Sequence, residues 1–130
     1  MLALLAIAML LGTPQAAPDD SFSARVLRGR LAEAGAGGAE YQKRMWERIN
    51  DPVTDLLKGC IASNAPADKS PFTVVADLAP DGRPGRIEAQ PATPVARCFA
   101  KGFADLALPA PPKLADSNAY PIEIDVSIVP

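Results

Sequence analysis

The stretch at residues 93–106 constrains the fold of this chain most, because it carries both start signals of a short helix. Thr93 can cap the first free backbone N–H groups, and Pro94 sits at the first helical position, where its missing N–H costs nothing. One side of the helix is apolar at helical spacing. This apolar stripe consists of Val95, Cys98, Phe99, Gly102, Phe103 and Leu106. Strand-like segments on both sides in sequence need such a surface to pack against, so we expect the helix to be central to the core.

Three segments of alternating polar and apolar residues predict strands at residues 72–78, 83–90 and 120–129. Residues 79–82 read Ala-Pro-Asp-Gly, which predicts a tight turn that joins the first two strands as an antiparallel hairpin. The helix at 93–106 then connects the second strand to the third, so those two strands should run parallel. If the first strand lies between them, the sheet order is second, first, third. We therefore predict an α+β fold, with N-terminal helices followed by a ββαβ three-stranded sheet that has one face covered by helices and a polar opposite face.

Two helical segments precede the strands. Ser21 can cap the first, whose predicted apolar side holds Phe22, Val26, Leu27 and Leu31 and whose predicted exposed side holds Arg25, Arg28 and Arg30. Those three arginines are either a solvated helix face or a docking surface. The second segment is apolar at three- and four-residue steps across residues 41–61, and Pro52 interrupts it. Two helices, or one helix kinked near Asn50 and Asp51, both satisfy this pattern.

The first residues resemble a secretory signal. Residues 1–11 form an uncharged apolar run, and small residues follow at Ala16 and Ala17. The run is too short for a transmembrane helix, and no basic residue precedes it. The alternative is a buried N-terminal helix, against which Pro14 and Pro18 argue. The predicted organisation is a signal peptide at 1–16, a helix and flexible joint at 17–38, and a single α+β domain at 39–130 with its ββαβ core at 71–130.

The chain has only two cysteines, Cys60 and Cys98, each on the apolar face of a predicted helix. Export makes a disulfide between them plausible, and two reduced buried cysteines are the alternative. The two are too far apart in sequence for a Cys-x-x-Cys redox motif. The sequence has no histidine, which removes histidine metal ligands and histidine bases, and its net charge of −2 gives no argument for nucleic acid. We expect no cofactor, no metal site and no catalytic residues.

Residues 71–130 resemble the C-terminal domain of TonB-type energy transducers and their periplasmic relatives. The shared features are the first strand ending in a Pro-Asp-Gly-Arg turn, the Thr- and Pro-capped helix, the Leu-Pro-x-Pro-Pro segment after it and a final alternating strand. The 130 residues show neither the anchoring helix nor the long proline-rich spacer of a transducer, and a Cys60–Cys98 pair is not a transducer feature. The resemblance implies that the last strand region engages an extended peptide of a membrane transporter by strand addition. The residues it assigns to partner binding are Tyr120, Ile122, Ile124, Val126 and Ile128.

These observations favour a non-enzymatic binding or adaptor protein, periplasmic or secreted, from a Gram-negative-type bacterium. Its expected partner is an envelope or outer-membrane protein, and we expect no nucleic acid and no stable membrane insertion after signal cleavage. An alternative is a disulfide-stabilised structural or inhibitory envelope protein, in which Pro121, Glu123, Asp125 and Pro130 block the last strand's edge. A third hypothesis is an enzyme that uses paired carboxylates, either Asp77 with Asp81 or Glu123 with Asp125, on the face expected to be exposed.

Overall fold

The computed structural model describes residues 20–129, so the predicted signal peptide lies outside the described residues. The elements are, in order, α1 (Phe22–Ala34), α2 (Gly38–Ser63), β1 (Phe72–Leu78), β2 (Pro84–Gln90), α3 (Pro94–Phe103) and β3 (Tyr120–Val126). This confirms the predicted α+β fold. The third strand is shorter than predicted, because it ends at Val126 and Ile128 follows outside it as a partly buried residue against the core.

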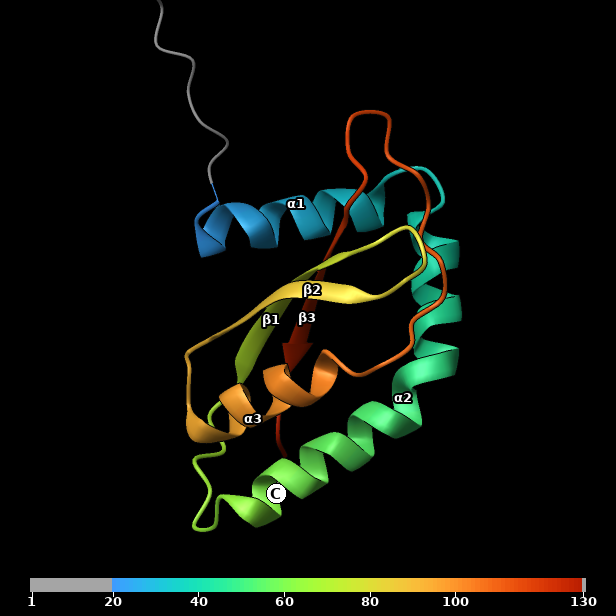
Figure 1. The fold of residues 1–130 in the computed structure, drawn as a ribbon. Helices are drawn as coiled ribbons and strands as arrows, with labels where there is room; N and C mark the ends of the chain where they lie inside the picture. Colours follow the sequence, from blue (N-terminus) through green and yellow to red (C-terminus); the bar gives the residue numbers. More distant parts are fainter. Residues whose placement is uncertain (1–19, 130) are drawn as a thin grey trace, which may run out of the picture.

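The sheet has the order β2-β1-β3, with β1 antiparallel to both neighbours (Figure 1). β2 and β3 therefore run in the same direction on either side of β1, as the crossover through α3 requires. The predicted turn joins β1 to β2: the N–H of Gly82 donates to the carbonyl of Ala79 over 2.8 Å. Gly82 has a φ of +91°, and a Cβ there would meet the Leu108 carbonyl oxygen, so only glycine fits this position.

One face of the sheet packs on α3 and α2, which lie below it in Figure 1. Thr93 caps α3 by accepting a hydrogen bond from the N–H of Ala96, and Phe99 and Phe103 on its apolar stripe are fully buried. Edge-to-face ring pairs join the layers, Phe72 to Phe99 and Tyr41 to Tyr120. The alternating residues of the strands complete this core with Val74, Ala76, Leu78, Ile122, Ile124 and Val126.

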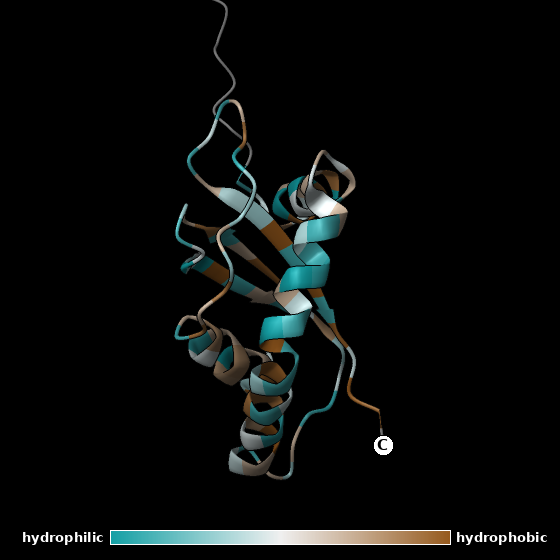
Figure 2. Ribbon diagram, turned by 90° about the vertical axis from the view of Figure 1, so that its right-hand side faces the viewer, coloured by the Kyte–Doolittle hydropathy of each residue, from teal (hydrophilic) through white to brown (hydrophobic). Residues whose placement is uncertain are grey.

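α2 is a single helix that contains Pro52 and bends near its middle (Figure 1), so the kinked-helix interpretation is the correct one. Its N-terminal half shows a hydrophilic outer side in Figure 2. Its C-terminal half brings Cys60 beside α3, where it forms the predicted disulfide with Cys98, at a Cα–Cα distance of 5.7 Å. The disulfide therefore ties together the two helices that cover this face.

α1 covers the opposite face of the sheet, which corrects two predictions (Figure 1). That face is polar but not open, and the helix is turned relative to its predicted orientation. Arg25, predicted to be exposed, is buried, whereas Leu27 and Leu31, predicted to be buried, are 58% and 62% exposed. The cause is the chemistry of the sheet face beneath α1, which carries charged residues. These residues pair with the arginine, whereas leucines in the same place would lack apolar neighbours.

We predict that Phe99→Ala lowers the free energy of unfolding by about 3–5 kcal/mol, because it leaves a cavity in the fully buried stripe of α3. Leu27→Ala, on the solvent side of α1, should change it by less than about 0.5 kcal/mol. Urea denaturation of both variants measures the difference. Equal effects of the two substitutions would mean that the α3 stripe is not the core.

We also predict that the Cys60→Ala, Cys98→Ala double variant is less stable by about 3–4 kcal/mol, because a cross-link that closes a loop of 38 residues restricts the unfolded chain. Thermal denaturation of the oxidised protein and of the double variant measures this loss. The denatured, unreduced protein should react with no thiol reagent, and labelling of two thiols would contradict the disulfide.

Candidate functional site

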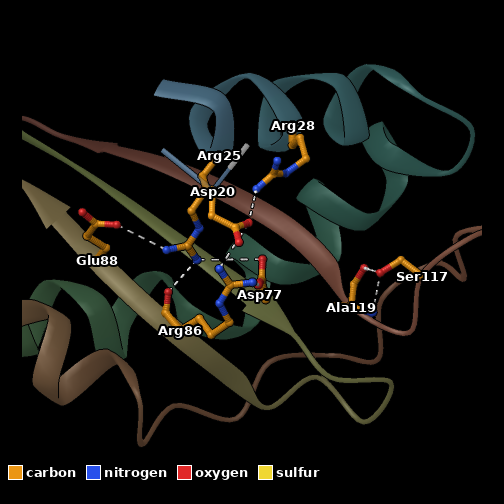
Figure 3. A network of polar contacts seen from close by, with 8 residues as sticks. All are labelled: Asp20, Arg25, Arg28, Asp77, Arg86, Glu88, Ser117 and Ala119. Carbon is orange, nitrogen blue, oxygen red and sulfur yellow. Dashed lines mark hydrogen bonds and ion pairs between the residues drawn. The ribbon is translucent and has the colours of Figure 1, made fainter. Parts of the chain in front are cut away.

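Two polar groupings lie between α1 and the sheet. The first, the arginine cluster, is made of Asp20, Arg25, Arg28, Asp77, Arg86 and Glu88 (Figure 3). Arg25 is its centre, with a side chain only 7% exposed. Its guanidinium donates to the Arg86 carbonyl and lies 3.5 Å from a Glu88 carboxylate oxygen and 3.9 Å from one of Asp77. Arg25 thus binds two strands at once from the helix above them.

A β-bulge in β2 presents that carbonyl. The register of β1 and β2 shifts between Val75 and Asp77, and Arg86 at the shift has a positive φ of 48°. A bulged residue is left out of the regular ladder, so its carbonyl is free for another donor. The Arg86 side chain turns back to Asp77, with a nitrogen–oxygen distance of 3.1 Å. The bulge therefore presents the Arg86 carbonyl as the acceptor to which Arg25 of α1 donates.

Asp20 extends the cluster at the start of α1, where its carboxylate lies 3.3 Å from Arg28 and 3.5 Å from Arg86. These contacts are more exposed than those of Arg25 and individually stabilise the fold little. The cluster as a whole fastens α1 to the sheet. Arg25 is therefore not available on the exposed side of α1. Of the three arginines, a docking surface on α1 would have to use Arg28 and Arg30 alone.

The second grouping is the acidic pair, Glu123 and Asp125, which share the α1 side of β3. Gly29 of α1 lies directly over Glu123, and a Cβ at Gly29 would come within 2.8 Å of the Glu123 Cβ. The Glu123 side chain is therefore only 6% exposed, and its Oε1 has no hydrogen-bond partner. The nearest cation is the Arg30 guanidinium, at 3.8 Å. That distance is too long for a hydrogen bond.

Burial, the hydrogen bond to Asp125 and the negative charge of Asp125 together raise the pKa of Glu123 to about 7, whereas Arg30 opposes the shift. The pKa of Asp125 shifts in the opposite direction. Its hydrogen bonds with Glu123 and with the Thr73 hydroxyl, which donates over 2.7 Å, hold its pKa below the usual range. Below about pH 7 the pair therefore shares one proton, carried by Glu123.

The residues assigned to partner binding lie in and after β3. The side chains of Tyr120, Ile122, Ile124 and Val126 are buried in the core, so they fix the strand's face and cannot themselves meet a partner. Ile128 is partly buried beyond the strand's end. Any contact at this strand must therefore be made through its backbone or through the residues between them.

β3 pairs with β1 on one side only, because the sheet order places it at an edge. Pro121 has no N–H, so its nitrogen is compatible with the strand only where it points away from β1. Backbone groups alternate in direction along a strand, and we infer that the N–H groups of Glu123 and Asp125 also point outward. The outer edge of β3 thus offers two donors, and both belong to the acidic pair.

Of the two carboxylate pairs considered for catalysis, only one is brought together. Asp77 is held by Arg86, whereas Asp81 accepts the N–H of Arg83 within the turn. Glu123 and Asp125 do interact, and Glu123 is covered by α1, which corrects the expectation that this face is exposed. Among residues 20–129, no group of three or more histidine, cysteine or acidic side chains could hold a metal ion.

Sequence reasoning missed Gly29 and the burial of Arg25 and Glu123. Gly29 stands between Arg28 and Arg30 in the middle of a helix, where glycine is unfavourable unless another backbone approaches closely. That position was the one local sign that α1 lies against a strand.

No family model, curated protein sequence or solved structure is significantly similar to this chain. Within residues 20–129, no helix has both the length and the apolar character needed to cross a membrane.

We predict that Glu123→Gln stabilises the protein at neutral and higher pH. The folded state binds the Glu123 proton more tightly than the unfolded chain, because the pKa rises from 4.5 to about 7 on folding. The wild type should therefore lose stability as the pH rises from about 4.5 to about 7, and then level off. Urea denaturation between pH 5 and pH 8 should show a smaller decline for Glu123→Gln, with exposed Glu40→Gln as the matched control. Parallel curves for the wild type and Glu123→Gln would contradict the shared proton.

Proposed function

We propose that this chain is a non-enzymatic binding or adaptor domain of the periplasm, which engages an extended peptide of an envelope or outer-membrane protein by strand addition. The observation that carries the proposal is the outer edge of β3. Its inner edge and its apolar face are already used by β1 and by the core, so only its outward backbone groups are left to pair with a partner strand. Main-chain pairing of this kind is a recurring mode of peptide recognition.

The other edge of the sheet is a poorer template. β2 begins at Pro84, which lacks a donor, and the bulge at Arg86 disturbs its regular ladder. Proline and bulges are the features that natural sheets use to prevent pairing at an edge. β3 is regular over its whole register with β1, from Tyr120 to Val126. Strand addition is therefore proposed at β3 and not at β2.

The location rests on three features of different kinds. The Cys60–Cys98 disulfide is consistent with an oxidising location outside the cytoplasm. The apolar run at residues 1–11, followed by small residues, supports export. The resemblance of residues 71–130 to periplasmic transducer domains supports the periplasm in particular.

A structural or inhibitory envelope protein is the second candidate, and one observation favours it. Pro121 and the acidic pair lie along the same edge that the first candidate uses, and charged residues at an edge discourage pairing. The two candidates differ in whether the outward N–H groups of β3 bind anything.

The test compares two substitutions at one position. Asp125→Pro removes an outward N–H as well as the carboxylate that accepts from Thr73 of β1. Asp125→Ala removes the same carboxylate and keeps the N–H, so the two variants differ in the outward donor. Partners would be captured by photocrosslinking in envelope preparations through a photoreactive residue at Ser127, identified by mass spectrometry and purified. We expect Asp125→Ala, which keeps Glu123 and the outward N–H, to bind more weakly than the wild type but measurably, and Asp125→Pro to lose binding.

Circular dichroism melting of both variants controls for folding. Equal affinities of a folded Asp125→Pro and of Asp125→Ala would show that the contact lies elsewhere. Failure to recover a partner that crosslinks at Ser127 would favour the structural or inhibitory candidate.

A further inference from the structure

We propose that the acidic pair is a receptor for a cation, and that the strand added to β3 carries a lysine or arginine side chain that forms an ion pair with Glu123 and Asp125. This inference rests on the proposed strand addition and specifies the chemistry of the partner. It commits to one occupant, an extended peptide with a basic residue at one defined position.

The position follows from sheet geometry. Side chains directly opposite each other on neighbouring strands share a face and have Cβ atoms about 4.5–5.5 Å apart. Glu123 and Asp125 both lie on the α1 side of β3, next to its outer edge. A partner residue opposite either of them therefore projects from the same, α1 side of the sheet, toward the two carboxyl groups. A lysine or arginine there has the reach to contact both carboxyl groups.

The acidic pair contains a buried carboxylate oxygen that has no hydrogen-bond donor. Glu123 Oε1 is buried without a hydrogen bond, and Arg30 remains 3.8 Å away, with its own side chain 62% exposed. Buried carboxylate oxygens are otherwise paired in folded proteins. Asp125, two residues farther along the strand, is exposed and accepts hydrogen bonds from the Thr73 hydroxyl and from Glu123. A partner ammonium or guanidinium would supply the missing donor to the first and a counter-charge to the second.

The charges that face the pair point to the same partner. α1 contributes Arg30 and Glu33, β3 contributes Glu123 and Asp125, and the residues of β1 opposite the pair are the uncharged Val75 and Thr73. Three carboxyl groups thus face one guanidinium. An acidic partner residue would be repelled there, and a neutral one would leave the excess of negative charge unchanged. Pairing of β3 with β3 of a second copy would bring two acidic pairs together, which disfavours self-association at this edge.

Binding of a cation should be linked to a proton. Near pH 7 Glu123 is protonated in part of the free molecules, as its raised pKa requires. A bound cation favours the ionised carboxylate, so the proton is released to solvent as the ion pair forms. Affinity for a basic peptide should therefore rise as the pH rises from about 6 to about 8, the range around the raised pKa. A peptide without the basic residue should show no such linkage.

The test begins with a random twelve-residue peptide library displayed on phage and selected at pH 8 against the folded, disulfide-bonded protein. Selected peptides are synthesised and titrated calorimetrically at pH 7 in two buffers of different ionisation enthalpy, which counts the protons released. We expect a lysine or arginine at one fixed position in every binding family. Replacing it with norleucine should weaken binding at least tenfold and abolish proton release.

Two protein variants assign the effect. Glu123→Gln, which keeps the shape of the side chain, should abolish proton release and reduce the preference for lysine over norleucine. Asp81→Asn, at an exposed acid in the β1–β2 turn, should leave both unchanged. Equal proton release from Glu123→Gln and the wild type would overturn the assignment to this residue.

Backbone N-methylation of the selected peptides separates this inference from the proposed function. Peptides that lose binding on N-methylation at alternate residues, but that show no basic residue and no proton release, would support strand addition and overturn the cation receptor. Binders that tolerate both N-methylation and Asp125→Pro would overturn both, as would a library that yields no binder.

Discussion

The buried guanidinium of Arg25 is the interaction on which the rest of this arrangement depends. A three-stranded sheet has two faces, and here α2 and α3 close one of them with apolar packing and a disulfide. The other face carries charged side chains, so apolar packing alone cannot close it. Arg25 reaches across to the Arg86 carbonyl, Glu88 and Asp77, while Gly29 lets α1 rest almost directly on the backbone of β3. Charge and the absence of a side chain together hold the helix in place.

That mode of closure shapes the edge of β3. Because Gly29 brings α1 so close, Glu123 is buried beneath the helix and keeps an unsatisfied oxygen. Its neighbour Asp125 stays at the surface. The outward backbone groups of these two residues are also the donors that a partner strand would need. The docking of α1, the shared proton and the proposed binding edge are therefore consequences of one local arrangement.

Local signals in the sequence predicted much of the fold. The cap and stripe of α3, the strand alternation and the Pro-Asp-Gly turn each depend on neighbouring residues, and the sheet order followed from them. The orientation of α1 could not be predicted in this way. Its leucines and arginines are interspersed along the helix, so the local pattern does not decide which side of the helix faces the sheet. Alternation in β3 showed which residues share a face, but not that a helix covers Glu123. The end of β3 was also missed, because Ser127 and Ile128 continue the alternation after the ladder stops.

Amide hydrogen exchange of β3, measured residue by residue by NMR, tests the central claim that this strand has a free outer edge. The N–H groups of Ile122, Ile124 and Val126 should exchange slowly, because they pair with β1. Those of Glu123 and Asp125 should exchange much faster, which gives an alternating pattern along the strand. Uniformly slow exchange across residues 122–126 would show that the edge is already covered, and it would contradict the account.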